Sequence, residues 1–165
     1  MHGIRIITTG GTFDKLYDAI KGELTFRESQ LPRVLQQSRT SLEITLETVF
    51  AVDSLNMTEA QRVLIAKHCS ASTEDKVVVI HGTDTMVASA NVIAQDPAIE
   101  GKTVVLTGAM IPYSLENSDA EFNLGFAIAA VQLLPPGVYI AMGGRVFDYD
   151  NVRKNREKGV FEALR

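Results

Sequence analysis

The chain of 165 residues has only one cysteine, Cys69, and no long apolar run. A single cysteine excludes an internal disulfide and is typical of a reducing compartment, so we expect a cytoplasmic protein. A membrane-spanning helix needs roughly 20 consecutive apolar residues, and no run approaches that length. The first predicted strand begins almost at the N-terminus, so we expect no signal peptide.

An excess of basic residues is also lacking, because 16 Lys and Arg stand against 20 Asp and Glu, for a net charge of −4. Nucleic acids and anionic membranes favour basic surfaces, so we expect neither as a partner. Apolar residues make up 45% and charged residues 22% of the chain, which is ordinary for a globular protein. The length suits one domain with a real core and is short for two.

Several catalytic signatures are absent. His2, His68 and His81 are scattered and show no metal-ligand spacing. No GxSxG motif is present, and Gly10-Gly11 is not part of a GxGxxG fingerprint. Cys69 lies in a predicted helix, which argues against a thiol nucleophile. We therefore expect no metal and no cofactor.

What the sequence does contain is an alternation of strands and helices. Four continuously apolar runs, typical of strands that are covered on both faces of a sheet, span residues 4–9, 76–82, 102–108 and 137–144. A fifth run, 42–50, alternates in polarity, and we expect it nearer an edge. Predicted helices follow at 58–70, 84–95 and 120–134. This order predicts an α/β fold, a single-domain, doubly wound and mainly parallel sheet of the flavodoxin or Rossmann-like kind.

Segment 13–30 carries charges and little periodicity, and we expect it to be a mobile lid. In doubly wound sheets the binding crevice lies outside the carboxyl ends of the strands. Small and hydroxyl-bearing residues gather after those ends in this sequence. They are Thr9–Thr12, Ser54, His81–Asp84, Gly108–Met110 and Gly143–Arg145.

Two threonines at strand exits, Thr12 and Thr83, suggest nucleophilic chemistry. A threonine hydroxyl needs a base, and a lysine oriented by Asp84 would supply one by the logic of a Ser-His-Asp triad. Each residue alone also has a plainer interpretation. Thr12 and Asp84 suit helix caps, and Lys154 suits a solvated surface. Taken one at a time, these plainer interpretations are favoured.

A resemblance connects these residues. "TTGGTF" and "HGTDTM" resemble the two signature motifs of the L-asparaginase family, amidohydrolases that convert asparagine to aspartate and ammonia. The similarity continues through "LTGAMIPYSLENSDAEFNL" (106–124) and "NVRKNREKGVFEAL" (151–164), so it spans nearly the whole chain. It implies that residues 1–165 form an asparaginase-like N-terminal domain with no C-terminal domain.

The resemblance also implies roles for individual positions. Thr12 matches the nucleophile, and Thr83, Asp84 and Lys154 match the remaining catalytic residues. Asp84 would in addition meet the α-ammonium group of the substrate. Tyr17 is the candidate for the lid tyrosine that positions Thr12, although it comes earlier than the family tyrosine does.

Further positions match groups that contact substrate. Ser54 matches the serine that holds the α-carboxylate, and Gly11 and Gly82 would let the backbone approach the substrate closely. Leu55 departs from the family pattern, because many relatives carry a polar residue there. The loop "FDKLYD" is a second departure, since a run of small residues that includes glycine is common there in the larger enzymes.

The resemblance implies an amidohydrolase that acts on L-asparagine, glutamine or a related amide through a threonine acyl-enzyme. Its setting would be amino-acid metabolism, and we expect a homodimer or higher homo-oligomer that closes the crevice. A second hypothesis is a weakly catalytic domain that binds an amino acid, which Leu55 and the missing second domain favour. A third is a nucleotide-binding domain, whose fingerprint is absent.

Overall fold

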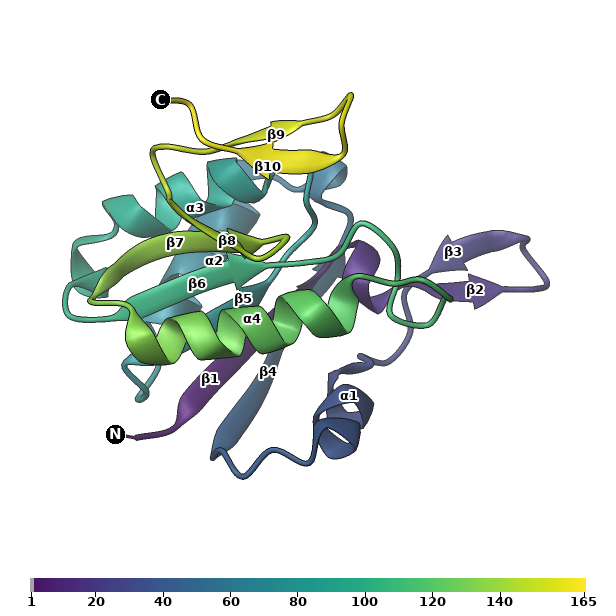
Figure 1. Cartoon of the computed structure of the whole chain (residues 1–165), viewed down its shortest axis with the longest axis horizontal. Coiled ribbons are helices and arrows are strands. Elements are labelled where there is room, and N and C mark those ends of the chain that lie inside the picture. Colours follow the sequence, from purple (N-terminus) through teal and green to yellow (C-terminus); the bar gives the residue numbers. More distant parts are fainter. Residues whose placement is uncertain (1) are drawn as a thin grey trace.

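A six-stranded sheet runs through the centre of the computed structural model, which describes residues 2–165 (Figure 1). Its strand order is β4-β1-β5-β6-β7-β8. The strands span β1 Ile4–Gly10, β4 Ile44–Val52, β5 Lys76–Ile80, β6 Thr103–Thr107, β7 Gly137–Met142 and β8 Arg145–Asp148. All neighbouring pairs are parallel except β7 and β8. The predicted α/β fold with a mainly parallel sheet is confirmed, and the alternating run forms the edge strand β4.

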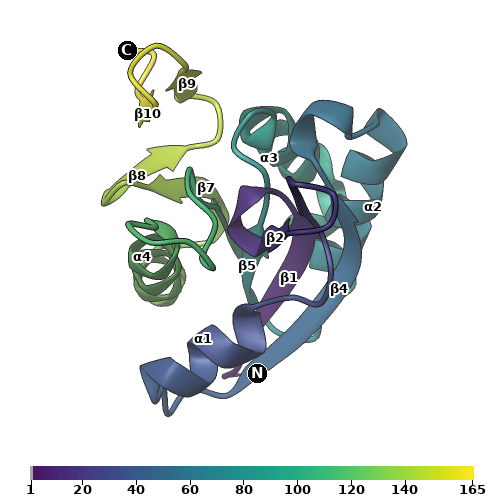
Figure 2. The same ribbon diagram turned by 90° about the vertical axis from the view of Figure 1, so that its right-hand side faces the viewer.

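Helices cover both faces of this sheet (Figure 2). Alternate residues of each strand point to opposite faces. Val77 and Val79 therefore pack with α2 (Glu59–Ala71) and α3 (Met86–Gln95), whereas Val78 and Ile80 pack with α1 (Leu31–Ser38) and α4 (Ala120–Leu133). Burial on both faces explains why these strands are apolar throughout rather than alternating.

The helix boundaries follow local signals in the sequence. Thr58 caps α2 as predicted, and a capping box with Gln61 completes the cap. Asp84 does not cap α3, which begins at Met86 after Thr85, and neither residue makes a side-chain cap bond there. The helix α4 ends at Leu133, before the two prolines.

Four features of the fold differ from the sequence prediction or were not anticipated. The run 137–144 is not one strand, because Gly143 and Gly144 both have positive φ, 60° and 80°, and turn the chain from β7 into β8. Within 13–30 the chain forms part of a short 3-10 helix (Thr12–Asp14) and the hairpin β2 (Leu16–Asp18) and β3 (Glu23–Thr25). The helix α1 and the hairpin β9 (Arg153–Asn155) and β10 (Val160–Glu162) were not predicted.

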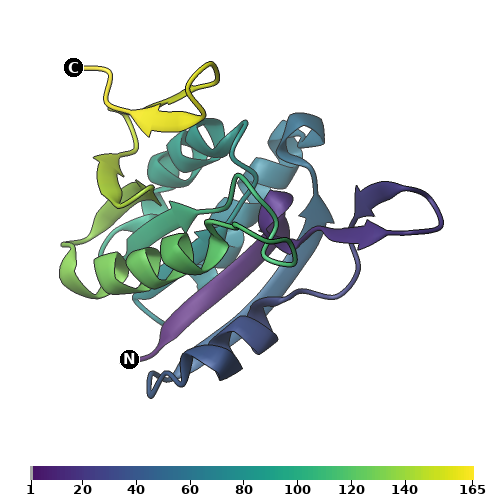
Figure 3. The same cartoon turned by 45° about the vertical axis from the view of Figure 1, so that its right-hand side comes forward.

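The two hairpins extend from different parts of the body (Figure 3). The β2–β3 hairpin projects away from the sheet, and the β9–β10 hairpin lies near the C-terminus, beside α3 and β7 (Figure 1). Val152 and Phe161 anchor the second hairpin, since both are buried in the core cluster that contains α2 and α3. Within residues 2–165, no helix is both long and apolar enough to cross a membrane.

Candidate active site

The predicted strand exits meet where the strand order reverses. After β1 the chain adds β4 on one side of it and β5 on the other, which makes β1 the topological switch point where doubly wound sheets bind ligands. Thr12 follows β1, Ser54 follows β4, and Thr83 follows β5. The topology thus brings these three residues to one end of three neighbouring strands.

Two glycines allow the loops after these strands to touch. A Cβ added to Gly11, whose φ is +78°, would lie 2.4 Å from the backbone nitrogen of Gly82. A Cβ added to Gly82 would lie 2.6 Å from Oγ of Ser54. No side chain fits in either gap, so close backbone approach requires glycine at both positions. Thr12 and Thr83, one residue beyond each glycine, are held on adjoining loops.

The β9–β10 hairpin positions Lys154 next to Thr83 and Asp84. Lys154 pairs with Phe161 across the two strands, and opposite residues of an antiparallel pair share one face. Because Phe161 is buried in the core, Lys154 also points inward, and its side chain is 13% exposed. The ammonium Nζ donates to Oγ1 of Thr83 at 2.7 Å and to Oδ1 of Asp84 at 2.9 Å. The structure therefore joins three of the predicted catalytic residues through one amine.

Thr12 begins the short 3-10 helix that Gly11 precedes, and its side chain forms no cap. Among the residues that the structure describes, no hydrogen bond engages the Thr12 hydroxyl. The segment beyond it is fixed on both sides. Lys15 forms an ion pair of 2.5 Å with Asp53, next to Ser54, and buried Asp14 accepts hydrogen bonds from Ser29 and the backbone of Gln30. Burial raises the pKa of the Asp14 carboxyl above its usual value.

The predicted binding residues differ in accessibility. Ser54 is buried, and its Oγ accepts from the backbone nitrogen of Thr85 at 3.3 Å, so its own proton stays available for donation. Tyr17 lies on the projecting strand β2, and 59% of it is exposed. Within residues 2–165, no hydrogen bond joins the Tyr17 hydroxyl to Thr12, so the predicted role of Tyr17 as a lid tyrosine stays a prediction. Leu55 is 68% exposed.

Two polar arrangements near the site were missed at the level of sequence. Arg156 donates through Nη1 to Oδ1 of Asp84 at 3.3 Å and through Nη2 to the Asp84 carbonyl at 3.1 Å. Buried Asn123 donates to the carbonyl of Gly108 and accepts from the nitrogen of Gly143, which links the ends of β6 and β7. The sequence signal that could have predicted the contact of Arg156 with Asp84 is the position of Arg156 two residues after Lys154.

His81 is fully buried beneath the Thr83 loop. Its Nδ1 lies 2.7 Å from the carbonyl oxygen of Gly82, and its Nε2 lies 2.6 Å from Oγ of Ser89. A carbonyl only accepts, so Nδ1 carries the proton, and Ser89 donates to Nε2. Burial lowers the pKa of the imidazole to about 4, so His81 is neutral near pH 7. It supports the loop from within the core.

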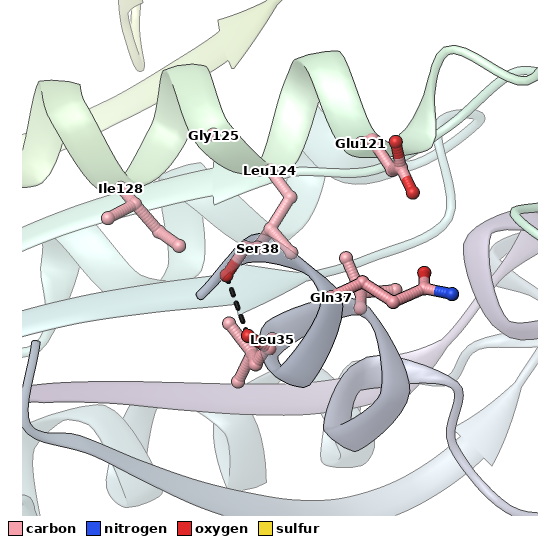
Figure 4. Close-up of a pocket in the computed structure, with 8 residues that line it drawn as sticks. Leu35, Gln37, Ser38, Glu121, Leu124, Gly125 and Ile128 are labelled. Carbon is pink, nitrogen blue, oxygen red and sulfur yellow. Dashed lines mark hydrogen bonds between the residues drawn. The ribbon is translucent and has the colours of Figure 1, made fainter. Parts of the chain in front are cut away.

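Other features that could carry chemistry are the cysteine, the possible metal ligands and a separate pocket. Burial raises the pKa of the Cys69 thiol to about 12, which disfavours the thiolate near neutral pH. In the described part of the chain, no three His, Cys, Asp or Glu side chains gather closely enough to hold a metal ion. A pocket of about 350 Å³ between α1 and α4 holds Leu35, Leu124 and Ile128 among its lining residues and none of the predicted catalytic residues (Figure 4).

The sequence matches the family model described as "Asparaginase, N-terminal" over residues 3–163. The chain belongs to this asparaginase family. Among solved structures, the probable cytoplasmic L-asparaginase of Campylobacter jejuni superposes with a TM-score of 0.84 at 28% identity, over 99% of this chain and 53% of that one. The thermostable L-asparaginase of Thermococcus kodakarensis gives a TM-score of 0.85 at 24% identity, over 98% and 51%, which shows the shared fold.

Curated relatives of this asparaginase-family chain carry two different names. The L-asparaginase of Thermococcus kodakarensis is 34% identical over 89 residues, which are 52% of this chain and 26% of the relative. A glutamyl-tRNA(Gln) amidotransferase subunit of Saccharolobus islandicus (strain M.14.25) is 29% identical over 141 residues, or 81% of this chain and 31% of the relative. The chain therefore spans about a third or less of these relatives and about half of the solved structures.

The contact between Gly11 and Gly82 predicts a large effect for a single methyl group. Gly11→Ala should lower the free energy of unfolding by about 1–3 kcal/mol more than Gly22→Ala, because the added Cβ displaces packed backbone. Gly22 is a matched control, since its φ is also positive, +68°, but a Cβ added there would meet nothing within 4 Å. Urea unfolding measures both values. Equal losses for the two variants would contradict the close contact.

Buried His81 predicts that stability decreases in weak acid. The unfolded chain binds a proton at the ordinary histidine pKa of about 6.5, whereas the folded chain resists protonation down to about 4. The unfolded state then holds more protons, so the free energy of unfolding should fall between about pH 6.5 and 4, with a slope on the order of 1 kcal/mol per pH unit from this residue. Urea unfolding across this range should show a smaller slope in His81→Asn than in the unchanged protein. An NMR titration of His81 near pH 6.5 would contradict the assignment.

Proposed function

We propose that this chain is an L-asparaginase-like amidohydrolase, which hydrolyses the side-chain amide of L-asparagine, glutamine or a related amide to the acid and ammonia. The observation that carries the proposal is the position of Lys154, whose amine lies within hydrogen-bonding distance of both Thr83 and Asp84. A solvated surface lysine has no need of a buried threonine partner. Membership of the asparaginase family and the Thr12 hydroxyl, which no hydrogen bond engages among the described residues, support the same chemistry.

In the proposed mechanism Thr12 attacks the amide carbon. An ester bond forms between Oγ1 and that carbon, the C–N bond breaks, and the nitrogen leaves as ammonia after receiving a proton. The proton of the threonine passes to the Lys154 relay, which requires the amine in its neutral form at that moment. Water then hydrolyses the ester and frees the threonine. Asp84 orients Lys154, and this reaction needs no cofactor.

A second assignment within the same function has its own support. The hydroxyl that Lys154 contacts in this structure is that of Thr83, not that of Thr12. Thr83 would then attack first, and Thr12 would assist from the adjoining loop. Both assignments use the same four residues and lead to the same products, and they differ in which threonine carries the ester.

The competing function is a weakly catalytic domain that binds an amino acid. The exposed Leu55, and the contact of Arg156 with Asp84, the carboxylate expected to receive substrate, favour this function. The relatives named as glutamyl-tRNA(Gln) amidotransferase subunits favour glutamine as an additional amide to test and a protein partner as an additional form of assembly. A cytoplasmic homodimer or higher oligomer remains our prediction for the setting of the enzyme.

Lys154→Met should lower kcat for ammonia release by about 10²–10⁴-fold, because proton transfer loses its relay. The double variant with Thr83→Val should be little worse than either single variant, since residues that act as one unit are not additive. Lys158→Met is the control: it removes a lysine from the same hairpin that lies exposed and makes no contact with Thr83 or Asp84 within the described chain. Near-native ammonia release by Lys154→Met would refute the relay.

Thr12→Val should lower kcat on the order of 10³-fold or more while substrate affinity is largely kept, because it removes the nucleophilic oxygen at nearly constant volume. Thr12→Ser keeps the oxygen and should retain measurable activity. Mass spectrometry of rapidly quenched protein with peptide mapping should find the aspartyl ester on Thr12. An ester on Thr83 supports the second assignment, and normal turnover by Thr12→Val excludes Thr12 as the nucleophile.

A further inference from the structure

Two positive charges share one carboxylate oxygen at the candidate site. Oδ1 of Asp84 accepts from Lys154 at 2.9 Å and from Arg156 at 3.3 Å. The second guanidinium nitrogen of Arg156 also binds the Asp84 carbonyl at 3.1 Å. Among the residues that the structure describes, no hydrogen bond engages Oδ2, which is the oxygen left for a ligand.

The two cations have different surroundings. The side chain of Lys154 is 13% exposed and has Thr83 as a second partner, whereas the side chain of Arg156 is 56% exposed and binds Asp84 alone among the described residues. Exposed ion pairs contribute little free energy. The Lys154 contact therefore belongs to the interior of the site, and the Arg156 contact lies at its rim, where a cationic ligand group can compete with it.

We propose that Arg156 determines how strongly this site selects ligands that carry an α-ammonium group, because its guanidinium competes with that group for the carboxylate of Asp84. This inference rests on the proposed function, in which Asp84 receives the ammonium of an amino-acid amide. A carboxylate that already faces two cations attracts a third more weakly than one that faces a single cation. Arg156 thus shifts the site toward ligands that bear the carboxylates of an amino acid but lack its amino group.

L-Aspartate and succinate test the inference directly. Both carry two carboxylates on the same four-carbon chain, and only aspartate has the ammonium group. Any general attraction between Arg156 and a ligand carboxylate affects both ligands, so the ratio of their dissociation constants reports mainly on the ammonium. Binding also requires no turnover, which separates this test from the test of catalysis.

Isothermal titration calorimetry should show that Arg156→Met raises the preference for L-aspartate over succinate by about fivefold, the upper range for an exposed ion pair. Arg156→Lys retains the charge and should keep the preference of the unchanged protein. Lys158→Met is the matched control, since it removes one positive charge from the same turn without a contact to Asp84, and it should leave the ratio unchanged. Thermal unfolding of each variant checks that the fold is retained.

An unchanged or lowered ratio in Arg156→Met overturns the inference, as does an equal rise in Lys158→Met or failure of both ligands to bind. Ammonia release from L-asparagine and L-glutamine is measured on the same preparations. A shifted ratio without ammonia release by the unchanged protein supports the inference and rejects the amidohydrolase proposal. Ammonia release with no shift in the ratio rejects the inference alone.

Discussion

The backbone of Gly11 lies so close to that of Gly82 that no side chain fits between them, and the candidate site depends on this contact. Because β1 and β5 are neighbours in the sheet, their exit loops emerge side by side. The positive φ of Gly11 turns the first loop against the second. Thr12 and Thr83 then stand on adjoining loops that are each tied to a buried strand, which limits how far either hydroxyl can move.

A second layer of contacts supports these loops from beneath. Neutral His81 holds the Gly82 carbonyl from within the core, and Ser54 fills the space beside Gly82 while it accepts from the nitrogen of Thr85. Buried polar groups of this kind are costly unless they are paired, and each is paired here. The exit loops of the candidate site are therefore held in place by the buried groups beneath them.

The amine of Lys154 reaches the candidate site from a distant part of the chain. Lys154 lies 70 residues after Asp84 in the sequence, on a hairpin whose position depends on burial of Phe161 and Val152 in the core. Its placement is a consequence of hydrophobic packing, since Phe161 and Lys154 are paired across the two strands and share one side of the hairpin. The asparaginase family match over residues 3–163 includes this hairpin.

From the sequence alone, five of the six strands of the sheet, three of the helices and the grouping of residues at strand exits could be predicted. Those features follow from local patterns: continuous apolar runs indicate buried strands, and capping residues such as Thr58 indicate where a helix begins. The motifs also predicted Thr12, Thr83, Asp84 and Lys154 as a set. Which of these groups are in contact became visible only in the folded chain, because contact between residues 70 positions apart depends on how distant elements pack.

The same reason explains what sequence reasoning missed. The hairpins β2–β3 and β9–β10 have three-residue strands, which are too short to show periodicity. The exposed position of Tyr17 follows from the direction in which the first hairpin projects, and no local pattern encodes that direction. In the sequence, Arg156 differs from other surface arginines only in its position two residues after Lys154, and its contact with Asp84 forms only in the folded chain. Local sequence patterns specify the helices and strands. Long-range packing specifies which side chains meet, such as Lys154 and Arg156 at Oδ1 of Asp84.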